Sequence, residues 1–201
     1  MAMTSDETDE ARLDRERRFH NERFADGGGE RRSSRFYSVA DDALREYSER
    51  VMAVEPGERV LEYGCGSGSM AFDLARAGAR VVGIDISDVA VATARARAGS
   101  EGLDATFEVM DAEALDLPAG SFDLVCGSGI LHHLDLERSM SQLSRVMAPG
   151  GRAVFFEPLG HNPLINLYRR VTPGERTVDE HPLLEADLVA GDPPEDEGEQ
   201  H

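Results

Sequence analysis

A glycine-rich turn and an acidic residue beyond it form the part of this sequence that is best suited to binding a ligand. Residues 62–68 read EYGCGSG and directly precede a segment with helical spacing. Glycines at such a turn let the backbone bend sharply and let a ligand approach without a Cβ atom in the way. Asp85 ends the next apolar run, 21 residues after Gly64. A carboxylate at that place accepts hydrogen bonds from both ribose hydroxyls of a nucleoside cofactor, so the pattern predicts a site for such a cofactor.

The spacing of the glycines argues against a dinucleotide as that cofactor. The dinucleotide fingerprint has a third glycine five positions after the first, whereas this chain has Ser69 there and has its glycines at Gly64, Gly66 and Gly68. An NAD(P)-dependent oxidoreductase therefore remains an alternative that shares Asp85 but lacks the glycine pattern.

Several side chains could act as a general base, which is needed only if an acceptor must lose a proton. The candidates are His132, His133, His161, His181 and Glu157. For His132 and His133 a structural role, such as a hydrogen bond to a loop carbonyl, is the favoured interpretation, and Glu157 can simply end a strand. No metal site is expected from the histidine pair, because adjacent residues seldom converge on one ion without further ligands at suitable spacing.

Two hydrophobic periods alternate along the chain and indicate the elements that position these residues. Short apolar runs rich in β-branched residues predict strands, and longer segments with helical spacing predict helices. The expected strands are residues 59–63, 80–84, 105–110, 122–126 and 152–156, and the expected helices are residues 69–77, 88–98 and 136–147. This alternation predicts a three-layer, doubly wound α/β fold of the Rossmann-like type, with a mostly parallel sheet of order 3-2-1-4-5.

The segment at residues 136–147 shows a clear amphipathic pattern. Its apolar stripe consists of Leu136, Met140, Leu143, Val146 and Met147. The following sequence PGG at residues 149–151 predicts the end of this helix.

Three regions are expected along the chain. Residues 1–37 are strongly charged and predict a mobile helical arm that could fold over a pocket as a lid. Residues 38–171 form the expected cofactor domain, and residues 172–201 form an extension with a disordered acidic tail. The extension has prolines and no clean apolar alternation, so no strands six and seven are expected. Strand five is then an open edge, which a helix after Asn162, a partner subunit or absent residues would have to cover.

Composition narrows the possible partners. The 39 acidic and 21 basic residues give a net charge of −18, which disfavours nucleic acid and anionic membranes as partners. The chain has no lysine; a halophilic source is one explanation and high genomic G+C is the other. No apolar run approaches the ~20 residues of a membrane span, and a cytoplasmic protein is expected. Cys65 and Cys126 do not form a disulfide framework or a metal motif.

An ordered set of motifs resembles the class I S-adenosylmethionine-dependent methyltransferases. The segment EYGCGSG resembles motif I of that family, residues 81–85 (VVGID) resemble its second motif, and Asp111-Ala112 resembles its adenine-binding motif. Residues 122–125 (FDLV) lead into residues 131–133 (LHH), and residues 143–151 resemble the helix and turn before strand five. The resemblance covers roughly residues 38–157, and it is to the group that includes ubiquinone and menaquinone methyltransferase-like enzymes.

The resemblance implies a set of residues that bind S-adenosyl-L-methionine: Glu62, Gly64, Cys65, Gly66, Asp85, Ile86, Asp111, Ala112, Gly127 and Ser128. Among the implied roles, Gly64 and Gly66 lie against the methionine part of the cofactor, Glu62 lies near its ammonium group, and Asp85 binds its ribose. Asp111, Ala112 and Ile86 surround the adenine, while Gly127 and Ser128 lie near the methionine amino group and the sulfonium.

The activity implied by this resemblance is methyl transfer to a small-molecule acceptor. Methyl transfer is an in-line displacement that needs alignment and exclusion of water more than a fixed set of catalytic side chains. A methyltransferase-like module that binds the cofactor without turnover is an alternative, because the segment after strand five departs from the family. The open edge of strand five also allows a homo-oligomer, in which a second copy covers that edge.

Overall fold

The protein is described from a computed structural model, and the structure describes residues 5–25 and 41–157. Within these residues the chain forms a single five-stranded parallel sheet of order β3-β2-β1-β4-β5. The strands are β1 (Arg59–Tyr63), β2 (Arg80–Asp85), β3 (Ala105–Val109), β4 (Phe122–Ser128) and β5 (Met147–Phe156). The predicted α/β fold and strand order are therefore confirmed.

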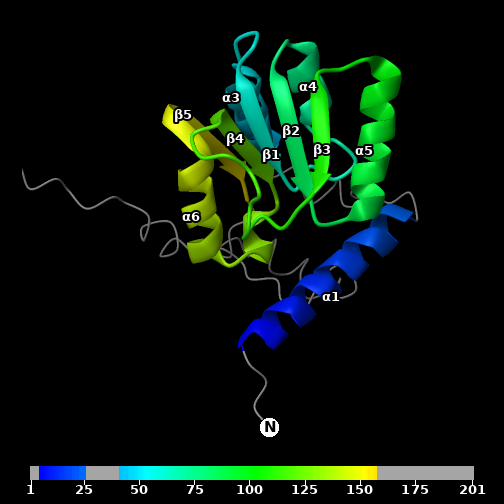
Figure 1. Ribbon diagram of the computed structural model, residues 1–201. Helices are drawn as coiled ribbons and strands as arrows, with labels where there is room; N and C mark the ends of the chain where they lie inside the picture. The colour runs from blue at the N-terminus through cyan, green and yellow to red at the C-terminus, as the bar shows by residue number, and fades with distance from the viewer. Residues whose placement is uncertain (1–4, 26–40, 158–201) are drawn as a thin grey trace, which may run out of the picture.

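The helices cover both faces of the sheet, as Figure 1 shows. Their bounds are α1 (Ser5–Ala25), α3 (Asp41–Met52), α4 (Ala71–Arg76), α5 (Asp88–Glu101), the 3-10 helix η2 (Leu131–His133) and α6 (Leu136–Val146). One layer of the core joins α3, α4 and α5 to the sheet, and the other joins α6 and the segment after β3 to the opposite face. Side chains that alternate along β1 enter both layers, because Val60 belongs to the first and Leu61 to the second.

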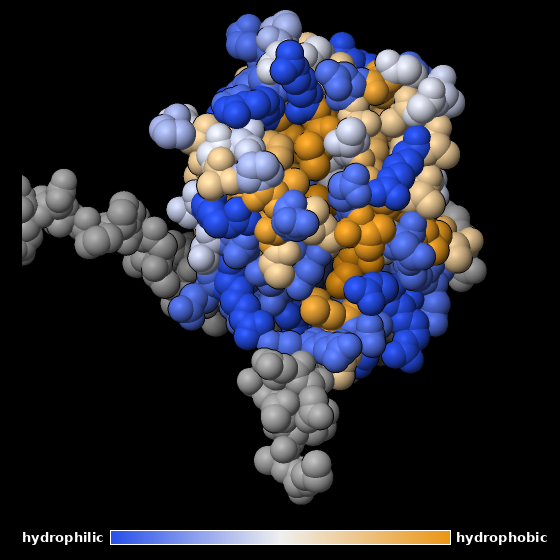
Figure 2. All heavy atoms as spheres, viewed as in Figure 1, coloured by the Kyte–Doolittle hydropathy of each residue, from blue (hydrophilic) through white to orange (hydrophobic). Residues whose placement is uncertain are grey.

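The face that α6 covers is the less complete of the two among the described residues. Figure 2 shows apolar residues that reach the surface on this side of the molecule. Thr106 and Glu108 of β3, which alternate with the buried Phe107 of the first layer, are both exposed. Three-layer packing is thus present, with a thinner second helical layer than the first.

Side-chain caps and a glycine define the ends of the helices beside the sheet. Ser87 begins α5 by accepting a hydrogen bond from the amide of Ala90 at 3.1 Å, and Asp135 begins α6 by accepting one from the amide of Arg138 at 3.0 Å. Gly102 ends α5 in the left-handed conformation, with φ of 64°. The two caps fix where loops at the carboxyl edge of the sheet enter the helices, and Gly102 ends α5 at the opposite edge, before β3.

The end of α6 and the start of β5 differ from the prediction. The strand begins at Met147 and runs through residues 149–151, which were expected only to stop the helix. A register shift opposite β4 absorbs the extra length, because Phe122 pairs with Met147 and Leu124 pairs with Arg152. The strand prediction at residues 152–156 was therefore correct in place but too short.

The predicted apolar stripe of α6 was wrong at one position. Met140 is 38% exposed, whereas Ser139 is fully buried. The hydroxyl of Ser139 donates to the carbonyl of Leu136 at 3.2 Å, which satisfies the polar atom inside the interface. A small satisfied side chain thus occupies the position nearest the sheet, and Leu143 and Val146 supply the apolar contact.

Several sequence predictions fall on residues 26–40 and 158–201, outside the described residues. They are the helix after Asn162, the absence of strands six and seven, and the acidic tail. No helix within the described ranges has the length and apolar character of a membrane span.

Candidate cofactor site and the helix beside it

The turn between β1 and α4 depends on glycines in the left-handed region. Gly64, Gly66 and Gly68 have φ of 62°, 53° and 97°. A Cβ atom at Gly68 would lie 2.0 Å from the ring of Phe72, and one at Gly64 would lie 3.0 Å from the side chain of Ile130. The turn therefore needs glycine both for its backbone conformation and for space, and it leaves a surface of bare backbone at the end of β1.

Glu62 anchors this turn to the following helix. It is 1% exposed, and its carboxylate accepts hydrogen bonds from the amides of Met70 and Ala71, each at 2.9 Å, and from the hydroxyl of Ser69. Burial raises the pKa of Glu62, while these hydrogen bonds act in the opposite direction. The structure thus gives Glu62 a role in starting α4; its implied contact with a cofactor ammonium stays a prediction.

Asp85 links the glycine turn to the loop after β2. Its Oδ2 accepts a hydrogen bond from the amide of Gly66 at 2.8 Å, and its Oδ1 accepts one from the amide of Ser87 at 2.9 Å. An ionised carboxylate offers about four acceptor positions, so Asp85 retains capacity for a ligand after these two bonds. Asp85 and the neighbouring Ile86 are both only partly buried. The sequence prediction that joined the glycine turn to Asp85 is consistent with this contact.

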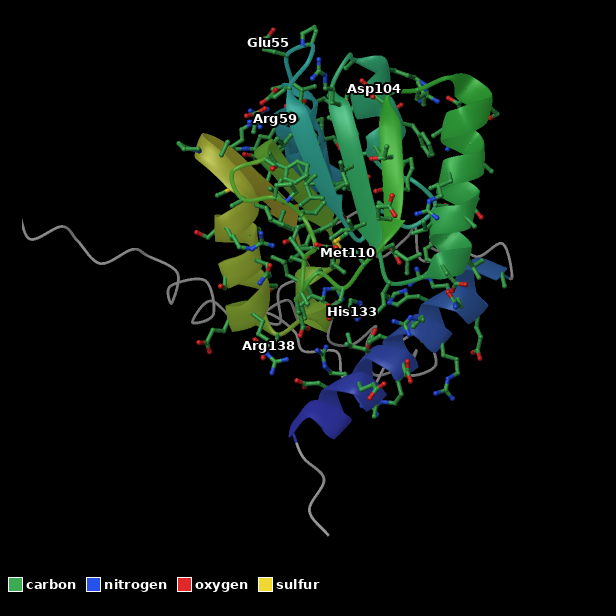
Figure 3. The ribbon with its side chains drawn as sticks, in the orientation of Figure 1. Glu55, Arg59, Asp104, Met110, His133 and Arg138 are labelled. Atoms are coloured by element: carbon green, nitrogen blue, oxygen red, sulfur yellow. The ribbon has the colours of Figure 1, made fainter. Side chains whose placement is uncertain are left out.

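The loop after β3 approaches the same edge of the sheet. The amide of Met110 donates to the carbonyl of Asp85 at 3.0 Å, and Met110 lies at the lower end of β3 in Figure 3. Oδ1 of Asp111 accepts a hydrogen bond from the amide of Glu113 at 2.8 Å. Ala112 is 7% exposed and packs in the core layer on the α6 side. The loop that carries the residues predicted for adenine therefore contacts the end of β2, which carries the residue predicted for the ribose.

The end of β4 lies beside β1 and completes the row of loops. A Cβ atom at Gly127 would lie 2.8 Å from the ring of Phe155 and 2.9 Å from the side chain of Ile130, so close packing requires this glycine. Cys65 is buried, and burial raises the pKa of its thiol, as it does for Cys126. Both cysteines are thus protonated side chains of the core, where they pack as small hydrophobes.

Glu157 organises the loop after β4. Its Oε1 accepts hydrogen bonds from the amides of Ile130 and Leu131 at 2.8 and 2.9 Å, and its Oε2 lies 2.7 Å from Nδ1 of His132. The side chains of Glu157 and His132 are each only 6% exposed. This arrangement supports a structural role for both residues, although the bond shown for His132 is to a carboxylate rather than to the expected loop carbonyl. The other base candidates, His161 and His181, lie outside the described residues.

Helix α1 crosses below the carboxyl ends of the strands (Figure 1). Nη2 of Arg12 contacts both carboxylate oxygens of Glu113 at 2.7 Å, and its Nη1 donates to the carbonyl of His133 at 3.3 Å. One turn from its end, Asn21 forms hydrogen bonds of 2.6 Å with both Asp88 and Ser87. The predicted arm is therefore helical, but these contacts fasten it against the domain.

A side chain of α1 also reaches the glycine turn. An atom of the Phe24 ring lies 3.0 Å from the place where a Cβ of Gly66 would be. Phe24 belongs to the segment that the sequence predicts as a possible lid, whereas the contacts of Arg12, Asn21 and Glu113 were not predicted. Arg12 and Glu113 are 101 residues apart, and no local pattern in a charged segment distinguishes the arginine that forms such a pair from those that face solvent.

Comparison with known proteins agrees with this geometry. Residues 60–151 match the family model described as "Methyltransferase domain". A ubiquinone biosynthesis O-methyltransferase of Nitrosococcus oceani is 35% identical over 114 residues, which are 56% of this chain and 48% of the relative. A demethylmenaquinone methyltransferase of Thermus thermophilus is 40% identical over 103 residues, which are 50% of this chain and 47% of the relative. The chain thus spans about half the length of these curated relatives.

A solved structure resembles the same part of the fold. The [4+2]-cyclase SpnF is 27% identical with a TM-score of 0.60, and the match covers 74% of this chain and 54% of the cyclase. Together with the strand order and the glycine turn, these matches support the resemblance of residues 60–151 to the class I S-adenosylmethionine-dependent methyltransferases. The resemblance inferred from the motifs is confirmed.

Proposed function

We propose that this chain binds S-adenosylmethionine at the carboxyl ends of β1, β2 and β4 and transfers its methyl group to a small-molecule acceptor. The observation that carries the proposal is the contact between Asp85 and the amide of Gly66, which places a partly exposed carboxylate beside a turn of bare backbone. A nucleoside with a charged amino-acid tail fits that combination, because the carboxylate suits ribose hydroxyls and the turn lets the tail approach the backbone.

The residues assigned to the cofactor are those of the predicted set. Asp85 would hold the ribose, Asp111 and Ile86 the adenine, and Gly64 and Gly66 the methionine part. Ser128 at the end of β4 is the remaining polar member near the transferred group. The bound cofactor supplies a methyl group on a positively charged sulfur, and this charge disperses as the methyl leaves. The chain itself therefore has to align the acceptor and exclude water rather than supply a strong acid.

Helix α1 is the described element best placed to exclude that water. It is fastened at Arg12 and at Asn21, and Phe24 lies over Gly66. We assign it the role of a lid that closes after the cofactor enters, as lids do in many enzymes. The net charge of −18 disfavours polyanions as acceptors, which supports a small molecule over nucleic acid.

Calorimetry tests the cofactor assignment. The full chain should bind S-adenosylmethionine and S-adenosylhomocysteine with one site each and should not bind NADH. Tight NADH binding without binding of the other two would replace the proposal with the oxidoreductase alternative.

A labelled-methyl transfer screen with small hydroxyl, amine and carbon acceptors then tests turnover. This second step is needed because the solved relative SpnF is named for a cyclisation rather than for methyl transfer. Cofactor binding without transfer to any acceptor would favour the module without methyl turnover over the methyltransferase.

The open edge of β5 supports a proposal about assembly. Among the described strands, β5 has a neighbour on one side only. We propose that two copies of this chain can associate along that edge, since unpaired strand edges tend to be covered. Sedimentation at several concentrations distinguishes a monomer from such a dimer.

A further inference from the structure

Two histidines and a glutamate meet between α1 and the loop after β4. Oε2 of Glu16 lies 3.5 Å from Nε2 of His20 and 3.4 Å from Nδ1 of His133. Taking one ligand atom from each residue, all three atoms lie within 4.8 Å of one another. Glu16 is 4% exposed, and the side chains of His20 and His133 are 19% and 11% exposed. We call these three residues the lid cluster.

The lid cluster has the composition and spacing of a transition-metal site. Glu16 and His20 are four residues apart on α1, which places them on one face of the helix. Bonds of ~2.0–2.1 Å to a tetrahedral zinc ion put neighbouring ligand atoms roughly 3.4 Å apart, and both separations from Glu16 are close to that value. Two imidazoles and one carboxylate also form a common set of three protein ligands, which leaves a fourth position for water or another oxygen ligand.

We propose that Glu16, His20 and His133 bind one Zn²⁺ ion that fastens α1 to the loop after β4. The sequence argument against a metal concerned only the pair His132 and His133, which lacked further ligands. The structure brings in Glu16 and His20 from α1, more than a hundred residues earlier in the chain. His132 is not among the residues whose ligand atoms converge here, and its Nδ1 lies 2.7 Å from the carboxylate of Glu157.

The surroundings allow a cation at this place. Arg12 donates to the carbonyl of His133, and its positive charge is offset by the carboxylate of Glu113, which it contacts through both oxygens. The buried carboxylate of Glu16 offsets part of the charge of the ion. An ion held from both elements would add a link between α1 and η2 to the link that Arg12 provides, and so would stabilise the closed position of the lid. This inference does not depend on the proposed methyl transfer.

The test uses the full chain, freed of metal with a chelator, and ZnCl₂ as the only ligand. Calorimetry should show one site of high affinity. Glu16→Gln and His20→Asn should each weaken it by at least about 100-fold, since loss of an outer-shell partner alone costs about 10- to 100-fold. Glu22→Gln removes the same charge from an exposed position of α1 and should leave the affinity unchanged. Hydrogen exchange of the α1 amides should slow on addition of Zn²⁺ in the parent and in Glu22→Gln only.

Two results would overturn the proposal. The parent chain could show no stoichiometric binding, in which case the lid cluster is only a hydrogen-bonded group. Alternatively, Glu16→Gln could bind as tightly as the parent, which would place the ion elsewhere on this acidic chain. Circular dichroism of each variant shows whether it folds, and His20→Asn locates the ion if Glu16→Gln does not fold.

Discussion

The glycine turn and helix α1 both lie at the carboxyl edge of the sheet, but different kinds of interaction hold them in place. Hydrogen bonds between neighbours in the βαβ unit hold the turn, such as those of Glu62 to the start of α4 and of Asp85 to Gly66. Helix α1 is held by polar pairs between residues far apart in the chain, such as Arg12 with Glu113 and Arg138 with Asp9. The turn is therefore part of the folded core, whereas α1 is an attachment whose position depends on a few charged contacts.

This difference indicates which of the two regions is rigid and which can move. Buried hydrogen bonds with backbone amides hold a rigid binding surface, since breaking any of them leaves an unsatisfied group in the core. Ion pairs that are partly exposed contribute little each and can exchange with water. A cofactor surface that stays in place and a lid that opens are the expected result, and the following variants test each half of this statement.

The largest expected effect is on cofactor binding through Asp85. Asp85→Ala would remove the two charge-assisted hydrogen bonds proposed for the ribose, worth about 1.5–3 kcal/mol each before solvent compensation. Affinity for S-adenosylhomocysteine should fall by at least about tenfold and by as much as about 1,000-fold, where 1.4 kcal/mol is tenfold. Asp85→Asn, which keeps one acceptor oxygen, should lose less.

Asp104 provides a matched control at the opposite end of the sheet (Figure 3). It is exposed and directly precedes β3, so Asp104→Ala should bind the cofactor as the parent does. Equal affinity of Asp85→Ala and the parent in calorimetry would contradict the assigned cofactor site.

The next effect is on the stability of the turn. Gly68→Ala places a methyl group 2.0 Å from the Phe72 ring, at a residue with φ of 97°. Overpacking costs about 1–3 kcal/mol, and the backbone conformation adds about 1–3 kcal/mol. Urea unfolding should show a loss of that order. Gly99→Ala is the control, because the helical Gly99 has nothing within 4 Å of its added Cβ atom, and there alanine should be neutral or stabilising by about 0.5–1 kcal/mol.

A small loss in Gly68→Ala, similar to the change in Gly99→Ala, would mean that the turn can shift. The turn would then resemble α1 in being adaptable, and the contrast between the two regions would fail.

The sequence predicted the turn well for the same physical reason that makes it rigid. Backbone conformations that require glycine, a carboxylate at a strand end and alternating hydrophobic periods are all local signals, and they located Gly64, Gly66 and Asp85 with the correct strand order. The missed contacts are those between distant charged residues. The segment around Arg12 contains several arginines and glutamates, and nothing local indicates that Glu16 becomes buried while its neighbours remain exposed.

The attachment of α1 is tested by removing its paired arginine. Arg12→Ala removes the nearer guanidinium partner of the Glu113 carboxylate, which is 3% exposed, and leaves it only Arg138 at 4.0 Å among the ion pairs shown. Such a loss costs up to about 3–5 kcal/mol for a fully buried pair; because Arg12 is 18% exposed and α1 can detach, we expect about 1–3 kcal/mol. Hydrogen exchange should show faster exchange in α1 with little change in the strands. The exposed Arg17 pairs only with Asp14 on the same helix among the contacts shown, so Arg17→Ala should exchange as the parent does.

A second substitution distinguishes the effect of the Glu113 charge from the loss of the α1 attachment. The double variant Arg12→Ala with Glu113→Gln also removes the carboxylate charge of Glu113. It should recover part of the stability of the domain without restoring the protection of the α1 amides from hydrogen exchange. If α1 keeps its full protection in Arg12→Ala, then the attachment depends on other contacts, the lid cluster being the first to examine.

The smallest expected effect is a pH dependence at the opposite, amino end of the sheet, where Arg59 of β1 bonds to Asp123 of β4. The two Arg59–Asp123 side-chain bonds are 2.6 and 2.9 Å long, and they lower the pKa of Asp123 from 3.8 to about 2. A carboxyl group with a lowered folded-state pKa adds stability above its unfolded pKa and loses it as the pH falls through the folded value. The stability difference between the parent and Asp123→Asn should therefore shrink between pH 4 and about 2. Because the side chains are 44% and 35% exposed, the difference should be at most about 1 kcal/mol.

Urea unfolding at several pH values measures this difference in stability. Hydrogen exchange of the α1 amides should stay unchanged in the variant, since this pair joins two strands and touches no lid contact. Loosening of α1 in Asp123→Asn would show that the sheet and the lid are coupled, and would remove the distinction between a rigid domain and an independently attached helix.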